Sequence, residues 1–393
     1  MRHFKPSSGL HNLISKLLLV LSFATAVSAF AADSKYLMFV GTYTGKGSLG
    51  IYSYRFDPDT GNATPLGLAA ESPNPSFLAA DPQGRFLYAV NEVNDFNGKP
   101  TGGVSAYKID RGTGKLELLN QVSSLGPGPA HISLDQTGHY VLIANYDGGS
   151  VAVYPVLNDG KLGEHSAFQQ QAGSSSVKDR QEGPHAHAIV TSLDDGFALA
   201  ADLGADKVFV YRFDNKNGAM SPNDPGFVSV PPGSGPRHLT FGSSGRFLYL
   251  ANELTGNVTV FTYDSKSGTL APKQTISALP ANFHGENTEA EIAVDSKGKF
   301  LYVSNRGDQT NTITVFRVSA KDGTLEFVQR VPSEGKAPRN FAMDPTGQWL
   351  LAANQESDSI QIFRVNQQTG QLSPTSKISG IVSPVSIVFV PAN

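Results

Sequence analysis

Short apolar segments alternate with tight polar turns along most of the chain, and this alternation repeats. The clearest copy spans residues 75–91, where two apolar runs flank the turn Asp81–Gly84. Glycine supplies the positive φ angle that a hairpin turn commonly requires. Equivalent turns recur at Asp135–Gly138, Leu193–Gly196, Gly242–Gly245, Asp295–Gly298 and Asp344–Gly347. Each copy therefore predicts an antiparallel pair of strands.

A second pattern follows each strand pair: an alternating strand, such as residues 104–109, then a polar turn with glycine and a fourth strand. The turn glycines are Gly61, Gly114, Gly160, Gly218, Gly268, Gly323 and Gly370. Four-stranded units spaced 46 to 58 residues apart are typical of propeller blades. The sequence thus predicts an all-β fold: a seven-bladed β-propeller with four antiparallel strands per blade.

The first pattern occurs six times and the second seven times, because the first unit begins at residues 36–40 without an innermost strand. Residues 385–390, near the C-terminus, resemble the innermost strands of the other units. We therefore expect the C-terminal strand to join the N-terminal blade and close the ring. Closure would remove the exposed sheet edges that favour aggregation.

The N-terminus has the features of a secretory signal peptide. Arg2, Lys5 and Lys16 precede the apolar run Leu17–Ala26, and Ala29–Ala31 matches a small-residue cleavage site. The run is too short to span a bilayer comfortably. We therefore expect a signal peptide over residues 1–31, a single propeller domain over residues 32–393, and a periplasmic or secreted protein without membrane contact after cleavage.

The amino-acid composition limits which molecules this protein could bind. The chain has no cysteine, so stability must come from packing without disulfides. Removal of residues 1–31 leaves 28 basic against 34 acidic residues and no Lys/Arg run, which argues against nucleic acid as a partner. We expect a monomer that binds a small molecule.

The internal copies separate architectural residues from candidates for function. The second strand of six units ends in Asn or Asp, which we interpret as a structural side-chain contact to turn backbone: Asn91, Asn145, Asp202, Asn252, Asn305 and Asn354. The next position varies instead: Glu92, Tyr146, Leu203, Glu253, Arg306 and Gln355. Long connections on that same face, over 92–103, 163–183, 279–288 and 306–311, mark it as the working face.

Polar residues also stand at the entries to the innermost strands, which rim the channel. His185 and His187 are two apart on one strand and face the same way, a spacing compatible with metal binding. No third ligand is indicated, so we predict neither a metal nor another cofactor. A purely structural role stays open for each of these residues. The two histidines could form hydrogen bonds within a blade, and Arg237 and Arg306 could pair with acidic neighbours. Glu253 could be a solvated surface carboxylate.

Six motifs in order, one blade apart, resemble the propeller-type 6-phosphogluconolactonase family over residues 36–390. They are Gly183–His187, Gly235–His238, Ala251–Glu253, Ala290–Ile292, Ser304–Arg306 and Pro338–Phe341. The family is similar to fungal enzymes that close muconates into lactones. The resemblance implies a catalytic set of His187 (or His185), Arg237, Glu253 and Arg306.

Opening a lactone requires a base that activates water and cationic donors where the carbonyl oxygen becomes negative. His187 or Glu253 can be the base, and Arg237 and Arg306 can bind a substrate anion or stabilise the oxyanion. We expect the substrate-binding rim to comprise His131, His185, His238, Glu291, Arg339 and Asn340. No G-x-S-x-G elbow supports a serine nucleophile.

The expected activity is hydrolysis of a sugar-derived or related lactone. A signal peptide would take the protein away from the cytoplasm, where 6-phosphogluconolactone is made, so a phosphate-free lactone is at least as plausible a substrate. Two alternatives stay open. One is a lactone-forming cycloisomerase, and the other is an exported propeller that binds a ligand or protein without turnover, because a fold alone does not establish chemistry.

Overall fold

The computed structural model describes residues 1–3 and 35–392, and Lys35–Asn393 form one compact unit. The predicted signal peptide, residues 1–31, lies outside the described residues apart from Met1–His3. Within the described part, no helix is long and apolar enough to cross a membrane.

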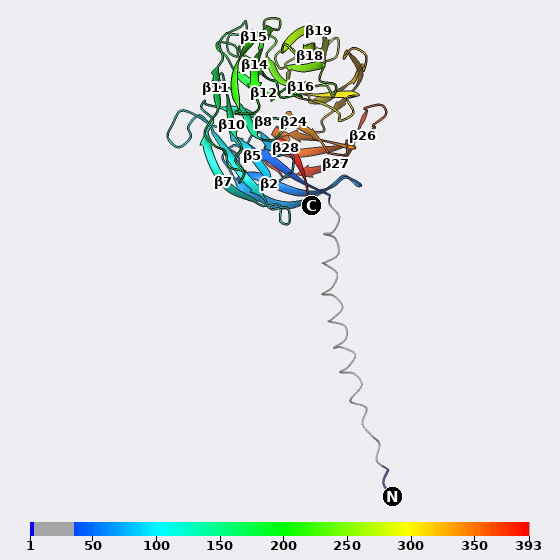
Figure 1. Cartoon of the computed structure of the whole chain (residues 1–393). Helices are drawn as coiled ribbons and strands as arrows, with labels where there is room; N and C mark the ends of the chain where they lie inside the picture. The colour runs from blue at the N-terminus through cyan, green and yellow to red at the C-terminus, as the bar shows by residue number, and fades with distance from the viewer. Residues whose placement is uncertain (4–34, 393) are drawn as a thin grey trace. The chain divides into compact units, whose positions relative to one another are not determined.

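Seven four-stranded antiparallel sheets form the blades, so the predicted seven-bladed β-propeller is confirmed (Figure 1). The first three blades are β28 (Pro384–Pro391), β1 (Tyr36–Thr42), β2 (Gly50–Asp57), β3 (Asn62–Glu71); β4 (Leu78–Ala80), β5 (Phe86–Asn91), β6 (Gly103–Ile109), β7 (Leu116–Ser123); β8 (Pro129–Leu134), β9 (Tyr140–Asn145), β10 (Ser150–Pro155), β11 (Ala167–Gln170).

The other four blades follow in chain order, with one short 3-10 helix in the last. They are β12 (Ala186–Thr191), β13 (Phe197–Asp202), β14 (Lys207–Asp214), β15 (Ala219–Ser229); β16 (Pro236–Phe241), β17 (Phe247–Asn252), β18 (Asn257–Asp264), β19 (Thr269–Ser277); β20 (Thr288–Val294), β21 (Phe300–Arg306), β22 (Thr312–Val318), β23 (Leu325–Pro332); β24 (Pro338–Met343), β25 (Trp349–Asn354), η1 (Gln355–Ser357), β26 (Ser359–Val365), β27 (Leu372–Ser379).

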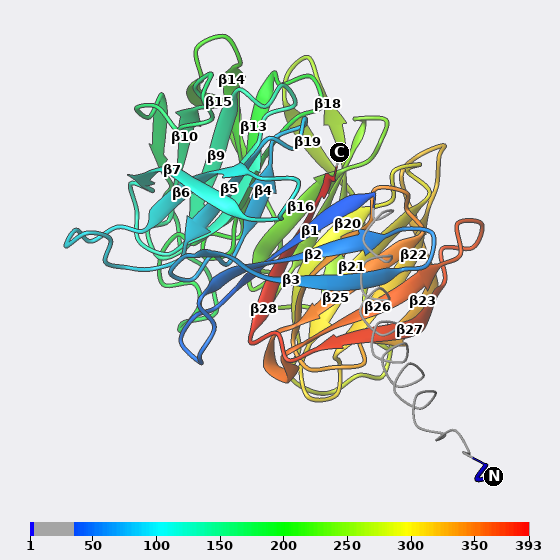
Figure 2. The same cartoon turned by 90° about the horizontal axis from the view of Figure 1, so that it is seen from below.

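The ring closes as the two pattern counts predict. Strand β28 is antiparallel to β1, with Leu37 opposite Val390 and Val40 opposite Ile387. Figures 1 and 2 show the red C-terminal strand beside the blue N-terminal strand. The first blade is therefore built from both ends of the described chain.

The turn glycines of the second pattern pack blades together. At Gly160, φ is 86° and an added Cβ would lie 2.3 Å from the Phe86 ring of the preceding blade. Five more of these glycines meet an aromatic ring in the same way: Gly61 on Trp349, Gly218 on Tyr140, Gly268 on Phe197, Gly323 on Phe247 and Gly370 on Phe300. Gly114 faces Leu66 instead. The repeated glycines are therefore architectural, because a side chain would separate neighbouring blades.

Two local expectations were wrong. At Leu193–Gly196 the turn closes one residue earlier, with Asp195 N donating to Ser192 O, so Asp195 takes the positive φ of 54° in place of the glycine. The expected long connection 163–183 contains β11, whose residues pair with β10 and complete the blade. The loop itself begins after Gln170.

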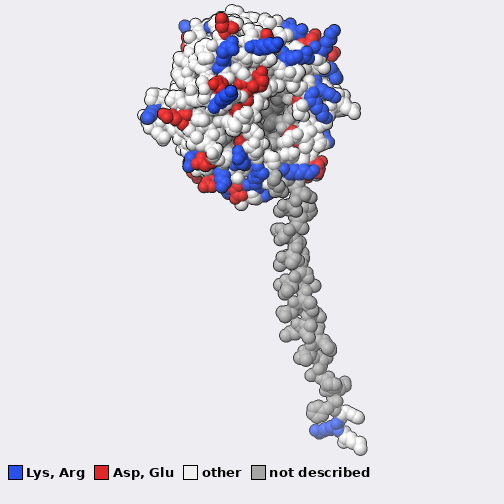
Figure 3. All heavy atoms as spheres, viewed as in Figure 1, with Lys and Arg blue, Asp and Glu red and all other residues white. Residues whose placement is uncertain are grey.

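Charge is mixed on one face of the molecule. On the face that Figure 3 presents, Lys and Arg lie among Asp and Glu and form no continuous basic surface. This distribution is unlike the clustered positive surface by which proteins bind nucleic-acid backbones.

Candidate active site

The entries to the innermost strands share a backbone conformation. In five blades a residue with positive φ precedes the proline that opens the entry: Asn74, Gly128, Gly235, Ala337 and Ser383. Just after the proline the pairing register shifts, for example between Pro129 and His131 and between Pro338 and Asn340. Such a bulge re-aims side chains at a strand end. The entry residues can therefore present polar groups to the channel mouth.

A cavity of about 170 Å³ lies at this mouth. Its lining comprises Glu92, Ala130, Tyr146, Arg180, His187, Glu253 and Arg339. These residues come from different blades and from the connection that follows β11. The cavity therefore collects side chains that are far apart in the sequence.

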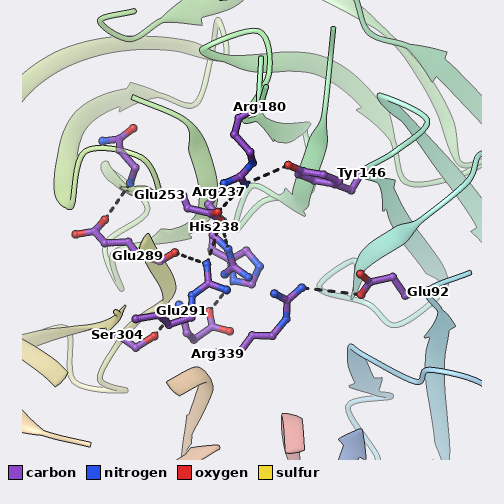
Figure 4. A network of polar contacts seen from close by, with 12 residues as sticks. Glu92, Tyr146, Arg180, Arg237, His238, Glu253, Glu289, Glu291, Ser304 and Arg339 are labelled. Atoms are coloured by element: carbon purple, nitrogen blue, oxygen red, sulfur yellow. Dashed lines mark hydrogen bonds and ion pairs between the residues drawn. The ribbon is translucent and has the colours of Figure 1, made fainter. Parts of the chain in front are cut away.

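Glu253 is the centre of an arginine cluster beside this cavity (Figure 4). Its Oε1 accepts a hydrogen bond of 2.7 Å from Arg180 Nη2, and Oε2 lies 2.8 Å from Arg237 Nε and 3.2 Å from Arg306 Nη2. The Arg237 contact is an ion pair without hydrogen-bond alignment, because Nε and Nη1 have no hydrogen-bond partner in the described chain. Three guanidinium groups thus hold one carboxylate.

The cluster changes the pKa of its members. Burial alone would raise the pKa of Glu253, but Arg306, Arg237 and Arg180 outweigh it and lower the pKa to about 2. Burial, with the charge of Arg306, lowers the pKa of Arg237 to about 9. At neutral pH Glu253 is therefore ionised and a weak base, and Arg237 is still protonated.

His187 has the opposite character. It is 4% exposed, and its Nδ1 has no hydrogen-bond partner among the described residues. Burial lowers its pKa well below the usual value, and the positive charges of Arg237 and Arg339 add to the effect. The imidazole is therefore neutral at neutral pH, and its buried Nδ1 is left without a partner beside the cavity.

His185 lies outside the cavity lining. Its ring stacks on Tyr146 at 4.7 Å, its Nδ1 lies 3.0 Å from Tyr146 O, and its Nε2 lies 3.1 Å from Glu182 Oε1. Both ring nitrogens are thus occupied. The geometry favours His187 over His185 as the group that faces a ligand.

A second layer of candidates packs against His187. The rings of His131 and His187 lie 5.3 Å and 5.1 Å from that of His238. His238 Nδ1 is 3.0 Å from Glu291 Oε1, and Asn340 Nδ2 donates to Glu291 Oε2 at 2.5 Å. Burial raises the pKa of Glu291 to about 6. These four residues form one bonded and stacked layer beside the cavity.

The structure thus brings every predicted site residue to one end of the channel, but in different positions. His187, Glu253 and Arg339 line the cavity. Arg237 is only 1% exposed, is not part of this lining and contacts Glu253. Arg306 lines a larger neighbouring cavity.

Sequence reasoning left four residues out of the site. Glu92 and Tyr146 occupy the variable position after the second strand, which was the available signal. Arg180 lies in a connection already marked as long, and Tyr43 donates from its hydroxyl to Glu92 at 2.8 Å. Arg339 Nη2 lies 4.0 Å from the same Glu92 carboxylate.

The histidines form no metal centre by geometry. Within the described residues, no three His, Asp or Glu side chains converge in a way that could hold a metal ion. The site instead combines the ionised carboxylate of Glu253, guanidinium groups and a neutral imidazole. This arrangement can bind an anion or an oxygen that becomes negative, and can accept a proton.

The fold and this site define a seven-bladed propeller with an arginine-rich pocket at one mouth of its channel. Residues 37–389 match the family model described as lactonase, 7-bladed beta-propeller. The chain therefore belongs to this lactonase family. The expectation of a 6-phosphogluconolactonase-like lactonase is confirmed at the level of the family.

Individual relatives of the chain are also named as lactonases. The chain is 35% identical to a 6-phosphogluconolactonase of Bacillus subtilis over 91% of this chain and 99% of that protein. It is also 35% identical to a 6-phosphogluconolactonase of Formosa agariphila, over 85% of this chain and 94% of that protein. The solved structure of the periplasmic gluconolactonase of Pseudomonas aeruginosa is 39% identical and covers 92% of this chain and 100% of its own, with a TM-score of 0.85.

Proposed function

We propose that this protein is an exported lactone hydrolase that opens a sugar-derived lactone in the cavity beside Glu253. One observation carries the proposal: His187, a neutral histidine whose buried Nδ1 has no partner among the described residues, lines a cavity that Arg180 and Arg339 also line. Relatives named as lactonases supply the reaction class. We further propose a monomer with one propeller domain over residues 32–393.

In this mechanism His187 is the general base. It takes a proton from water as the water oxygen attacks the lactone carbonyl carbon. The carbonyl oxygen becomes negative, and Arg180 and Arg339 at the cavity wall donate hydrogen bonds to substrate oxygens. The tetrahedral intermediate collapses as the acyl C–O bond of the ring breaks, and the imidazolium returns its proton to the ring oxygen. The product is the open hydroxy acid.

Glu253 acts as a positioning residue in this account. A carboxylate with a pKa of about 2, held by three arginines, is a poor proton acceptor but a firm anchor for the guanidinium groups. Arg237 and Arg306 orient Glu253 and keep the pocket positive. Burial and then the positive charge of Arg237 lower the pKa of His187, so the negative charge that develops on the carbonyl oxygen would raise that pKa and strengthen the base.

Export points to a lactone without phosphate. The sequence of residues 1–31 is typical of a signal peptide, and the similar Pseudomonas structure is of a periplasmic gluconolactonase. An exported enzyme meets the lactones of the periplasm or the surroundings. We therefore propose an aldonolactone without phosphate as substrate.

A lactone panel tests the proposal. Purified protein is assayed by pH-stat against glucono-δ-lactone, 6-phosphoglucono-δ-lactone and a muconolactone, with spontaneous hydrolysis subtracted. The proposal expects acid release above background, fastest with the unphosphorylated sugar lactone. Preference for the phosphorylated lactone would overturn the substrate, and formation of lactone from muconate would favour the cycloisomerase. Ligand binding without turnover of any lactone would favour a binding propeller.

A further inference from the structure

A second and larger cavity opens on the same face as the proposed active site. Its volume is about 920 Å³, and its lining includes Arg306, Asn287, Asp308, Gln309, Gln355 and Glu356. The cavity beside Glu253 holds only about 170 Å³. Pockets for drug-sized ligands are typically about 300–1,000 Å³, so the small cavity suits one ring and the large one suits more.

The two cavities share a wall. Arg306 lines the large cavity and is paired with Glu253, which lines the small one. Two consecutive residues also line different cavities: Glu253 lines the small cavity, and Leu254 lines the large one. The Arg306–Glu253 ion pair therefore stands between the two cavities, and a ligand long enough to pass over it would enter both.

Two long connections build the large cavity. An added Cβ on Gly307 would lie 2.4 Å from Glu286 O, so only glycine lets these backbones approach so closely. This contact ties the segment before β20 to the segment after β21. The two connections that form the cavity wall therefore pack directly against each other.

The chemistry of the lining favours a neutral polyol. Six polar side chains on it, Glu286, Asn287, Asp308, Gln309, Gln355 and Glu356, make no hydrogen bond or ion pair with other residues of 35–392. Both amide atoms of Asn287 and the Nε of Arg306 are buried without partners. Amides and carboxylates match sugar hydroxyls as donors and acceptors, whereas the three carboxylates disfavour a phosphate or other anion.

We propose that the substrate is a glycosylated aldonolactone, an oligosaccharide whose reducing-end sugar is the lactone. The lactone ring occupies the small cavity beside Glu253, and at least one further sugar occupies the large cavity. This inference rests on the proposed lactonase function and adds its substrate class. The reaction that supplies such a substrate is oxidation of the reducing end of an oligosaccharide.

The test compares one lactone ring with and without an added sugar. The probes are glucono-δ-lactone and cellobiono-δ-lactone, whose reacting rings are alike, and kcat/KM is measured for both by pH-stat. We expect the disaccharide lactone to be preferred by at least about tenfold. Equal values, or a preference for the single ring, would overturn the inference and leave the lactonase intact.

Variants of the large cavity test whether it is the source of the preference for the disaccharide lactone. Asn287→Ala and Gln309→Ala should each lower the ratio of disaccharide to monosaccharide kcat/KM by about fivefold, the scale of one net hydrogen bond. Gln368→Ala is the matched control, because Gln368 is an exposed glutamine in a short turn between β26 and β27 and should leave the ratio unchanged. A preference that survives both cavity variants would overturn this placement of the second sugar.

Calorimetry separates failure of the inference from failure of the proposed function. If neither lactone is hydrolysed, the lactonase proposal fails. Cellobionate is then titrated into the parent and into Asn287→Ala. Binding weakened about fivefold in the variant would retain the sugar site, and equal or absent binding would overturn it.

Discussion

The substitution Glu253→Gln has consequences that follow directly from the contacts of this carboxylate. Its Oε1 is 2.7 Å from Arg180, and its Oε2 is 2.8 Å from Arg237 and 3.2 Å from Arg306. The Glu253 side chain is only 6% exposed, so water cannot easily replace these contacts. Removing one partner of a buried ion pair costs about 3–5 kcal/mol, because the remaining charge is left uncompensated.

The pKa of Glu253 leads to a similar free energy. Burial alone would raise it, but the three arginines lower it from 4.5 to about 2. Because the folded pKa lies below the unfolded value, the stabilisation is fully present above about pH 5 and is lost as pH falls through about 2. At about 1.4 kcal/mol per pKa unit, Glu253 contributes about 3 kcal/mol at pH 7 and about 1 kcal/mol at pH 3.

Thermal unfolding at pH 7 and pH 3 measures this contribution. For a folded unit of roughly 360 residues, 1 kcal/mol corresponds to about 1.3 °C, so Glu253→Gln should lower Tm by about 4 °C at pH 7 and by less than half as much at pH 3. Glu92→Gln is the matched control, because its nearest arginine, Arg339, is 4.0 Å away, and its Tm should change by less than about 1 °C. Parental Tm for Glu253→Gln at pH 7, or a loss as large at pH 3, would refute the reasoning.

Three further predictions address closure, export and substrate binding. Deleting residues 381–393 removes β28 and should lower Tm by more than about 10 °C in a thermal scan, whereas an unchanged Tm would exclude a stabilising role for closure. Mass spectrometry of the exported protein should give a chain that begins near residue 32, and a product that retains Met1 would contradict cleavage. Arg339→Lys keeps the charge but loses the planar fork, so kcat/KM for the lactone hydrolysed by the parent should fall about 10²-fold in steady-state assays. A fall of less than twofold would remove Arg339 from the mechanism.

The fold was predictable because its determinants are local and repeated. Each glycine turn specifies a hairpin. The unequal counts of the two patterns show that one strand is missing, and the innermost-strand pattern of residues 385–390 places it within β28. The exceptions are also local. The turn at Ser192–Asp195 is shifted by one residue because aspartate can take a positive φ in place of Gly196.

The site was only partly predictable. Comparison between blades isolates Glu253 and Arg306, because equivalent positions hold other residues. It cannot show that Arg180 reaches Glu253, because the connection between β11 and β12 that carries Arg180 is longer than the equivalent connections of the other blades. Hydrogen-bond and ion-pair partners depend on three-dimensional contacts, so only the structure separates the two candidate bases: three arginines hold Glu253, whereas His187 Nδ1 has no partner among the described residues.

The most direct test of the account is the turnover number of His187→Ala on the lactone that the parent hydrolyses fastest. Loss of a positioned general base commonly removes about 10²–10⁴-fold of rate, and the account predicts a fall in kcat of this size. Far-ultraviolet circular dichroism and Tm close to those of the parent would show that the fold is retained. A well-folded His187→Ala protein with the parental kcat would contradict the central claim that this cavity hydrolyses a lactone through His187.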